Sequence, residues 1–325
     1  MVLSPSGLSR DRACIRRVRY VMGTFVEIEV ACEHQPQAAD AIEAAFSEFR
    51  RLEGLLSKFI PDSPVGQVNR FGSGHPVEVP REMFDLTERA VRFSEKTSGA
   101  FDITVNPLME LWGTAEMKGI LPRDEEMVST LAKVDTQHLL LSAEDSTIGF
   151  KAPGCQIDFG AIGKGYAMDR AVEVLKRYEV THALVNAGGA ISCLDEYPSA
   201  IGIRNPLDAE DLLASVTLQN NSVATSASGE RFFRIGGDRY SHVIDPRTGN
   251  PVHHHLVSAT VIADTAELAD VFSTAVFVLG LNRGMDLIEA TEGLEAVLLR
   301  GYSSPFEVHI SSGLKETSRT TPTNF

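Results

Sequence analysis

Cysteine is scarce in this sequence, with four residues in a chain of 325. The four lie far apart, and none belongs to a CxxC pair. This distribution argues against a structural zinc site and against a disulfide scaffold. We therefore expect the thiols to be small buried hydrophobic groups, at Cys14, Cys32, Cys155 and Cys193.

Long apolar runs are also lacking. No stretch approaches the roughly 18 residues that a membrane-spanning helix needs. The first twenty residues are rich in arginine and lack the apolar core of a signal peptide. We expect no membrane segment and a cytoplasmic location.

Positive charge is in deficit, since 30 Lys and Arg face 44 Asp and Glu and leave a formal net charge of -14. The basic residues gather only between positions 10 and 19. Because a field of this sign repels polyanions, nucleic-acid binding is not expected. An anionic substrate would need local cations or a metal ion.

No internal repeat or low-complexity linker interrupts the chain, and helix and strand patterns mix without a regular βαβ alternation. This favours an α+β fold. Residues 1–17 and 311–325 lack a hydrophobic period and are expected to be mobile tails of a single domain, 18–310. The predicted helices cover 38–56, 80–96, 166–178, 265–279 and 283–291, with a weak helix and short strands between 121 and 150; the other predicted strands cover 19–31, 182–187, 201–204, 213–218, 257–262, 296–300 and 306–310.

Residues 158–166 place three glycines and Lys164 just before a predicted helix. Free N–H groups at a helix start, together with a lysine, could meet a phosphate. The Walker spacing is missing, however, and a tight strand-to-helix turn with a solvated lysine explains the same residues equally well.

Residues 240–249 combine strong turn chemistry with an imidazole and a carboxylate, His242 and Asp245. A carboxylate that orients a histidine is the usual arrangement for a general base acting on a hydroxyl. A histidine before a turn is more often a structural hydrogen-bonding group, but its neighbours favour a functional one here.

Asp270 and Thr274 stand four residues apart in an apolar helical stretch, so their oxygens project from one face. That spacing suits two hard ligands of a Mg2+ ion. The alternative is a polar stripe facing solvent, but apolar residues surround the pair. A carboxylate in such surroundings needs a partner.

Two further patterns carry weaker signals. Residues 185–189 end in Gly188-Gly189, which suits a ligand lying against a strand end but is more simply a turn. The triple His253-His254-His255 looks like a metal site, yet adjacent histidines cannot all face one ion. We expect an exposed loop or strand end there.

Taken in order, these patterns resemble the ApbE family of flavin transferases from Met22 to about Leu299. Seven motifs in the same order carry the resemblance: Met22-Gly23-Thr24, residues 100–105 with Pro107-Leu108, residues 158–166, residues 185–189, Ala224-Thr225-Ser226, residues 241–249 and residues 269–280.

The resemblance implies an α+β fold of the tunnelling-fold type, with mixed sheets, packed helices and two lobes around an FAD cleft. By position it implies Mg2+ ligands at the main-chain oxygen of Ala161 and the side chains of Asp270 and Thr274. The FAD contacts that it implies are Met22, Phe59, Ala100, Phe101, Asp102, Asp158, Lys164 and Ile244.

Two positions and one segment depart from the family pattern. Phe59 stands where many members carry a tyrosine, so a stacking face is kept and a hydroxyl is lost. Ser273 stands where some members have a second aspartate, which lowers the negative charge near the ion. Residues 224–229 are a variant of the commoner Thr-Ser-Gly, with no expected effect on the chemistry.

The implied activity is Mg2+-dependent transfer of FMN from FAD to a Thr or Ser hydroxyl of an acceptor flavoprotein, with release of AMP. His242 is the predicted general base and Asp245 its orienting partner. The same residues would serve an FAD pyrophosphatase, in which water replaces the hydroxyl. A non-catalytic FAD-binding protein would use them for binding alone.

Overall fold

The computed structural model describes residues 2–3, 13–32, 35–195, 199–205, 212–228, 232–301, 306–316 and 320–322. The chain divides into two compact units. The first unit comprises Met1–Glu53, Ile162–Ala227 and His255–Phe325, and the second comprises Gly54–Ala161 and Ser228–His254. Within the described ranges, no helix combines the length and apolar character needed to cross a bilayer. The cytoplasmic location stays a prediction.

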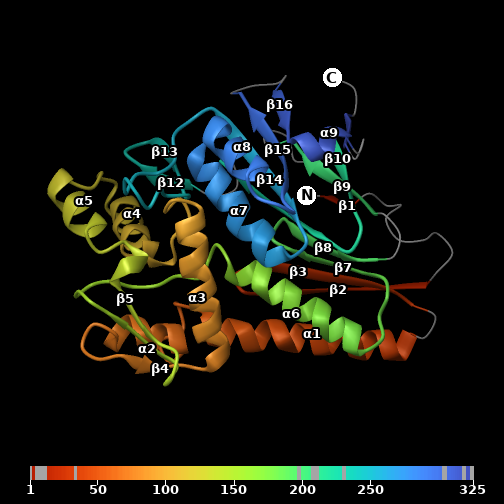
Figure 1. Cartoon of the computed structure of the whole chain (residues 1–325), viewed down its shortest axis with the longest axis horizontal. Helices are drawn as coiled ribbons and strands as arrows, with labels where there is room; N and C mark the ends of the chain where they lie inside the picture. The colour runs from red at the N-terminus through yellow and green to blue at the C-terminus, as the bar shows by residue number, and fades with distance from the viewer. Residues whose placement is uncertain are drawn as a thin grey trace. The chain divides into compact units, whose positions relative to one another are not determined.

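An eight-stranded antiparallel sheet runs through the first unit (Figure 1). Its strand order is β16-β15-β14-β11-β8-β7-β3-β2. The central strands β7, β8, β14 and β15 bury aliphatic residues on both faces, so both faces of this part of the sheet must be covered. The bounds are β2 Ala13–Val21, β3 Thr24–Cys32, β7 Ala183–Ala187, β8 Ala190–Leu194, β11 Ser222–Ala227, β14 Leu256–Ala263, β15 Glu295–Arg300 and β16 Glu307–Ile310.

Helices cover one face of this sheet. They are α1 (Gln35–Leu56), α6 (Gly163–Arg177) and α7 (Ala266–Leu279), shown in Figure 1. In α1, buried apolar residues recur three or four positions apart, which gives the helix one core-facing stripe. Almost the whole circumference of α7 is buried, including Asp270.

A smaller sheet with the order β1-β9-β10-β17 covers the other face. Aliphatic residues of β9 and β10 share one buried cluster with Ile191, Val223 and Leu299 of the large sheet. The bounds of the small sheet are β1 Val2–Leu3, β9 Ser199–Arg204, β10 Leu212–Leu218 and β17 Thr320–Pro322; α8 (Leu281–Glu289) and α9 (Ser312–Glu316) complete the described elements of this unit.

The second unit packs short helices with small sheets. Trp112 of α4 lies at its core, where the indole packs against Phe233 and Tyr240 and donates from Nε1 to the main-chain oxygen of Gly249 at 2.9 Å. This bond fixes the 245–250 turn to α4. The elements are α2 Pro64–Phe71, β4 Val77–Glu78, α3 Arg81–Lys96, α4 Asn106–Lys118, α5 Asp124–Leu131, β5 Leu139–Ser142, β6 Thr147–Phe150, β12 Phe232–Ile235 and β13 Asp238–Ser241, with 3-10 turns η1 Ile103–Val105 and η2 Thr136–His138.

Two hairpins in the first unit turn through two residues with positive φ. Met22 (+52°) and Gly23 (+70°) join β2 to β3, and Gly188 (+58°) and Gly189 (+95°) join β7 to β8. Two positive φ values suit the twist of a tight hairpin. The 185–189 motif therefore contains the plain turn that its glycines predict. A Cβ on Gly188 would lie 2.8 Å from Thr24 Oγ1, so a side chain is excluded there.

The prediction of an α+β fold is confirmed. The predicted helices agree with α1, α3, α6, α7 and α8 to within a few residues. The single strand at 19–31 is wrong, because the Met22-Gly23 turn splits that region into β2 and β3. Helix α4 was not predicted, and neither was α2, which begins at Pro64.

The structure differs from two further expectations, which concern the two tails and the burial of the cysteines. β2 begins at Ala13, inside the predicted tail 1–17, and α9 and β17 lie inside 311–325. Cys155 and Cys193 are buried as expected, but Cys14 is exposed, because it lies on β2 next to the inward-facing Ile15. The burial of Cys32 lies outside what the structure describes.

Candidate functional site

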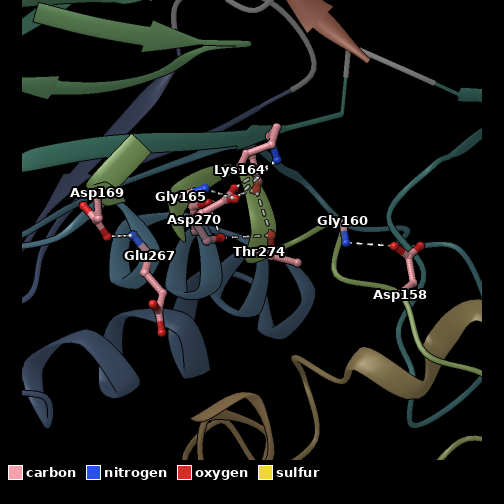
Figure 2. A network of polar contacts seen from close by, with 10 residues as sticks. Asp158, Gly160, Lys164, Gly165, Asp169, Glu267, Asp270 and Thr274 are labelled. Atoms are coloured by element: carbon pink, nitrogen blue, oxygen red, sulfur yellow. Dashed lines mark hydrogen bonds and ion pairs between the residues drawn. The ribbon is translucent and has the colours of Figure 1, made fainter. Parts of the chain in front are cut away.

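The first unit brings the predicted lysine and the predicted metal ligand together. Lys164 lies in the first turn of α6, and its Nζ is 3.3 Å from both carboxylate oxygens of Asp270 on α7. The backbone N–H of Gly165 donates to Asp270 Oδ2 at 3.1 Å (Figure 2). The buried carboxylate therefore has the partner that its surroundings require. The start of α6 supplies both the cation and an N–H group.

Hydroxyl groups surround the next turn of α7. Thr274 Oγ1 and Ser273 Oγ donate to the main-chain oxygen of Asp270 at 3.1 and 3.0 Å. Ser226 on β11 brings a third hydroxyl, 3.1 Å from Ser273 Oγ and 3.5 Å from Thr274 Oγ1. One carboxylate and three hydroxyls thus form a patch of hard oxygen atoms in the first unit.

Ala161 is the last residue of one segment of the second unit. Its main-chain oxygen stays a predicted third ligand. Within the described residues, no group of three or more His, Cys, Asp or Glu side chains is arranged to hold a metal ion.

Asp169 ties α6 to the beginning of α7. Its carboxylate accepts the backbone N–H groups of Ala266 and Glu267 at 2.7 and 2.9 Å (Figure 2). Burial raises the pKa of Asp169 to about 6, and the two N–H donors oppose that rise. The helix that carries Asp270 and Thr274 is therefore held at its first turn by a carboxylate of the helix that carries Lys164.

The raised pKa of Asp169 predicts a pH-dependent contribution to stability. Because the folded pKa of about 6 exceeds the ordinary 3.8, the folded state binds the proton more tightly between these values. The free energy of unfolding should therefore fall as pH rises from about 4 to about 6. Asp169→Asn carries no titrating group, so its Tm relative to the wild type should be higher at pH 7.5 than at pH 4.5.

Differential scanning fluorimetry at the two pH values checks this prediction. Asp286→Asn, at an exposed carboxylate of α8, is the matched control and should show no such pH-dependent difference. An equal Tm difference for Asp169→Asn at both pH values would contradict the raised pKa.

In the second unit, a backbone hydrogen bond links Asp158 to the residue that follows Asp102. Asp158 N–H donates to the main-chain oxygen of Ile103 at 2.7 Å, next to Asp102. Asp102 Oδ1 accepts from Thr104 N and Oγ1 at 2.7 and 2.6 Å. Burial raises the pKa of Asp102 above its ordinary value, and the Thr104 hydrogen bonds oppose the rise. Asp158 Oδ1 accepts from Gly160 N–H at 2.8 Å.

The predicted FAD contacts differ widely in exposure. Ala100, Phe101 and Ile244 are buried, each 4% exposed or less, so their side chains belong to the core and any ligand contact would be through the main chain. Phe59 is the opposite case, with 83% exposure. Met22 is partly buried, and its N–H donates to Glu53 Oε1 at 2.7 Å, which holds the strained turn.

Asp245 is engaged by an arginine of its own turn. Arg247 Nε and its main-chain N–H donate to Asp245 Oδ1 at 2.8 and 2.9 Å, and Arg247 Nη2 donates to Oδ2 at 2.8 Å. His242 is half-buried three residues earlier. Orientation of the His242 ring by Asp245 stays a prediction. The residues 253–255 are exposed or half-buried, in agreement with a loop.

Sequence reasoning missed Lys58, Glu53, Asp169 and Arg247. Lys58 Nζ forms an ion pair with Asp158 Oδ2 at 2.7 Å across 100 positions of the chain. No local pattern signals such a pair. Arg247 lies within the motif at residues 240–249. Its position two residues after Asp245 in a turn was a local signal for this ion pair.

Comparison with known proteins agrees with the motifs. The family model described as ApbE family matches residues 22–298. A protein named FAD:protein FMN transferase from Escherichia coli (strain K12) is 31% identical over 90% of this chain and 86% of its own length, and one from Klebsiella pneumoniae (strain 342) is 33% identical over 78% and 80%. The crystal structure of the ApbE protein of Thermotoga maritima superposes with a TM-score of 0.84 at 30% identity, covering 94% of this chain and 99% of that one.

Proposed function

This chain belongs to the ApbE family, and we propose that it is an FAD:protein FMN transferase that attaches FMN to a Thr or Ser hydroxyl of an acceptor flavoprotein and releases AMP. Relatives that carry the transferase name align over most of the chain. The structural observation that carries the proposal is the buried Asp270, held by Lys164 and by the first turn of α6. A cation beside oxygen atoms that can hold Mg2+ suits an anionic dinucleotide.

We propose that FAD is bound by Lys164, Phe59 and the other residues that the family resemblance implies. Lys164 and the start of α6 would meet the pyrophosphate, because they offer positive charge in a chain with a net charge of -14. The exposed Phe59 ring would stack on a flat ring system. The remaining proposed contacts are Met22, Ala100, Phe101, Asp102, Asp158 and Ile244.

The patch of oxygen atoms formed by Asp270, Ser273, Thr274 and Ser226 fits a Mg2+ ion. Mg2+ takes oxygen ligands, and it is commonly held by one or two carboxylates plus substrate phosphates. Lys164 Nζ lies 3.3 Å from both oxygens of Asp270, and we propose that the ion takes the place of this ammonium group. Asp270, Thr274 and the Ala161 oxygen would hold it. When bound, it would neutralise charge on the pyrophosphate.

The reaction forms one bond and breaks one. The acceptor hydroxyl oxygen attacks the FMN phosphorus, the pyrophosphate P–O bond breaks, and AMP leaves with the electron pair. His242 takes the hydroxyl proton, and Lys164 offsets negative charge that grows on the leaving phosphate. Positioning supplies most of the remaining acceleration.

The general-base role predicts a selective loss in His242→Ala. This variant should bind FAD with an unchanged Kd, because the imidazole acts on the incoming hydroxyl, and its transfer rate should fall by about 100-fold. FAD binding is measured by quenching of flavin fluorescence and transfer by FMN incorporation. Transfer at the wild-type rate would assign the proton to another group.

Incubation with FAD and Mg2+, with and without an acceptor flavoprotein, tests the proposed function. Covalent flavin on the acceptor, accompanied by AMP in equal amount, is the expected result. AMP and free FMN without an acceptor would instead indicate a pyrophosphatase. Unchanged FAD in both mixtures would indicate a non-catalytic FAD-binding protein.

A further inference from the structure

Lys58 is the centre of a polar network in the second unit. Its Nζ lies 2.7 Å from Asp158 Oδ2 and 2.5 Å from Asn106 Oδ1. The Asn106 amide is itself oriented, because its Nδ2 donates to Gln156 Oε1 at 2.7 Å. The ammonium group therefore sits between a carboxylate and a fixed amide oxygen at the start of α4.

The ion pair is largely withdrawn from water. The side chains of Lys58 and Asp158 are 15% and 17% exposed, so the attraction is screened less than at the surface. The second carboxylate oxygen of Asp158 accepts from Gly160 N–H. Both oxygens of Asp158 are thus directed by defined donors, and its charge is balanced by one cation.

The same ammonium group also contacts Phe59. Lys58 Nζ lies 5.2 Å from the centroid of the Phe59 ring, a distance typical of a cation–π contact. The ring is 83% exposed, and this contact favours the ring position beside Lys58. One lysine therefore touches two of the residues that we propose to bind FAD.

We propose that Lys58 is a positioning residue for FAD, which holds Asp158 and Phe59 in place and cancels the charge of the Asp158 carboxylate. This inference rests on the proposed function. Without Lys58, a poorly hydrated carboxylate would stand unpaired at a proposed contact of an anionic dinucleotide. Lys58 acts through Asp158, so its importance depends on the charge at position 158.

A double-mutant cycle on FAD binding tests this dependence. In Mg2+-free buffer, Lys58→Met should raise the Kd for FAD by about tenfold when Asp158 is present. In an Asp158→Asn background the same substitution should change the Kd by less than about threefold, because no carboxylate is left to neutralise. Binding is measured by flavin fluorescence quenching, and a rise in KM with little change in kcat should accompany it.

Lys118→Met is the matched control, because it removes an exposed lysine from the last turn of α4 and should leave the Kd unchanged. A Kd within twofold of wild type for Lys58→Met would overturn the proposal. Equal losses with and without the Asp158→Asn substitution would also overturn it, because Lys58 would then act independently of Asp158.

A second variant distinguishes a loss of folding from a loss of FAD binding. If Lys58→Met shows no cooperative thermal transition, the uncharged Lys58→Met/Asp158→Asn variant carries the test and should bind FAD as Asp158→Asn does; weaker binding overturns the inference. Wild-type protein that binds FAD without transferring FMN would contradict the proposed function alone, and the cycle would still decide the role of Lys58.

Discussion

Replacing Asp270 by alanine is expected to reduce FMN transfer by about three orders of magnitude. The substitution removes the one carboxylate among the proposed Mg2+ ligands, and a bound metal ion supplies several kcal/mol of charge stabilisation in reactions of this kind. It also removes the acceptor of Lys164 Nζ and Gly165 N–H, so the groups at the start of α6 lose their common anchor. Transfer is measured as covalent flavin fluorescence on the acceptor after denaturing electrophoresis.

Two further variants separate chemistry from folding in this prediction. Asp270→Asn keeps the shape of the side chain and an oxygen for Gly165 N–H, so it should keep a near-wild-type Tm and still lose transfer. We expect Mg2+ to raise the Tm of the wild type, and Asp270→Asn should lose that rise. Asp286→Ala, at an exposed carboxylate of α8, should retain full activity. Near-wild-type FMN incorporation by Asp270→Ala would exclude Asp270 from the metal site.

The local part of the site could be predicted from the sequence, because its signals are short-range. Asp270 and Thr274 are one helical turn apart, and in a helix with apolar residues on nearly all sides Asp270 is buried and Thr274 is half-buried. The requirement that such a carboxylate have a partner followed from the cost of burying charge. That the partner would be Lys164, 106 positions away, did not follow from this reasoning.

The contacts that sequence reasoning missed join residues that are distant in the chain. Lys58 pairs with Asp158, and Asp169 caps a helix that begins nearly 100 positions later. Each of these residues, taken alone, resembles an ordinary surface position. Only the folded packing of α6 against α7, or of the Lys58 loop against the 156–160 segment, gives them a role.

The secondary structure shows the same difference between local signals, which the sequence reveals, and tertiary contacts, which it does not. The apolar stripe of α1 predicts a helix because its period is local. The β2–β3 hairpin was mistaken for one strand, because a Met-Gly turn lacks the Asn-Gly signal and places a non-glycine residue at φ +52°. Such strain is maintained by tertiary contacts, here the Glu53 carboxylate that accepts the Met22 N–H.

Gly165→Ala is expected to cause a large loss of stability. A Cβ at this position would lie 2.2 Å from the main-chain oxygen of Ala266 and 2.8 Å from Glu267 Cα. Both obstacles are backbone atoms, so no side chain can rotate away and α6 must move from α7. We expect a loss of about 3 kcal/mol or more in the free energy of unfolding, or roughly 6–12 °C in Tm.

The same displacement should reduce FMN transfer, because the α6–α7 contact carries the functional groups as well as the packing. Gly165 N–H donates to Asp270, and Asp169 holds Ala266 and Glu267, so separating the helices disturbs both links at once. Gly54→Ala is the control: it adds a methyl group in an exposed part of α1 with open space around it and should raise stability by about 0.5–1 kcal/mol. Thermal and urea unfolding measure both variants. If Gly165→Ala proved as stable as the wild type, the close approach of α6 to α7 could not be what positions Lys164 against Asp270.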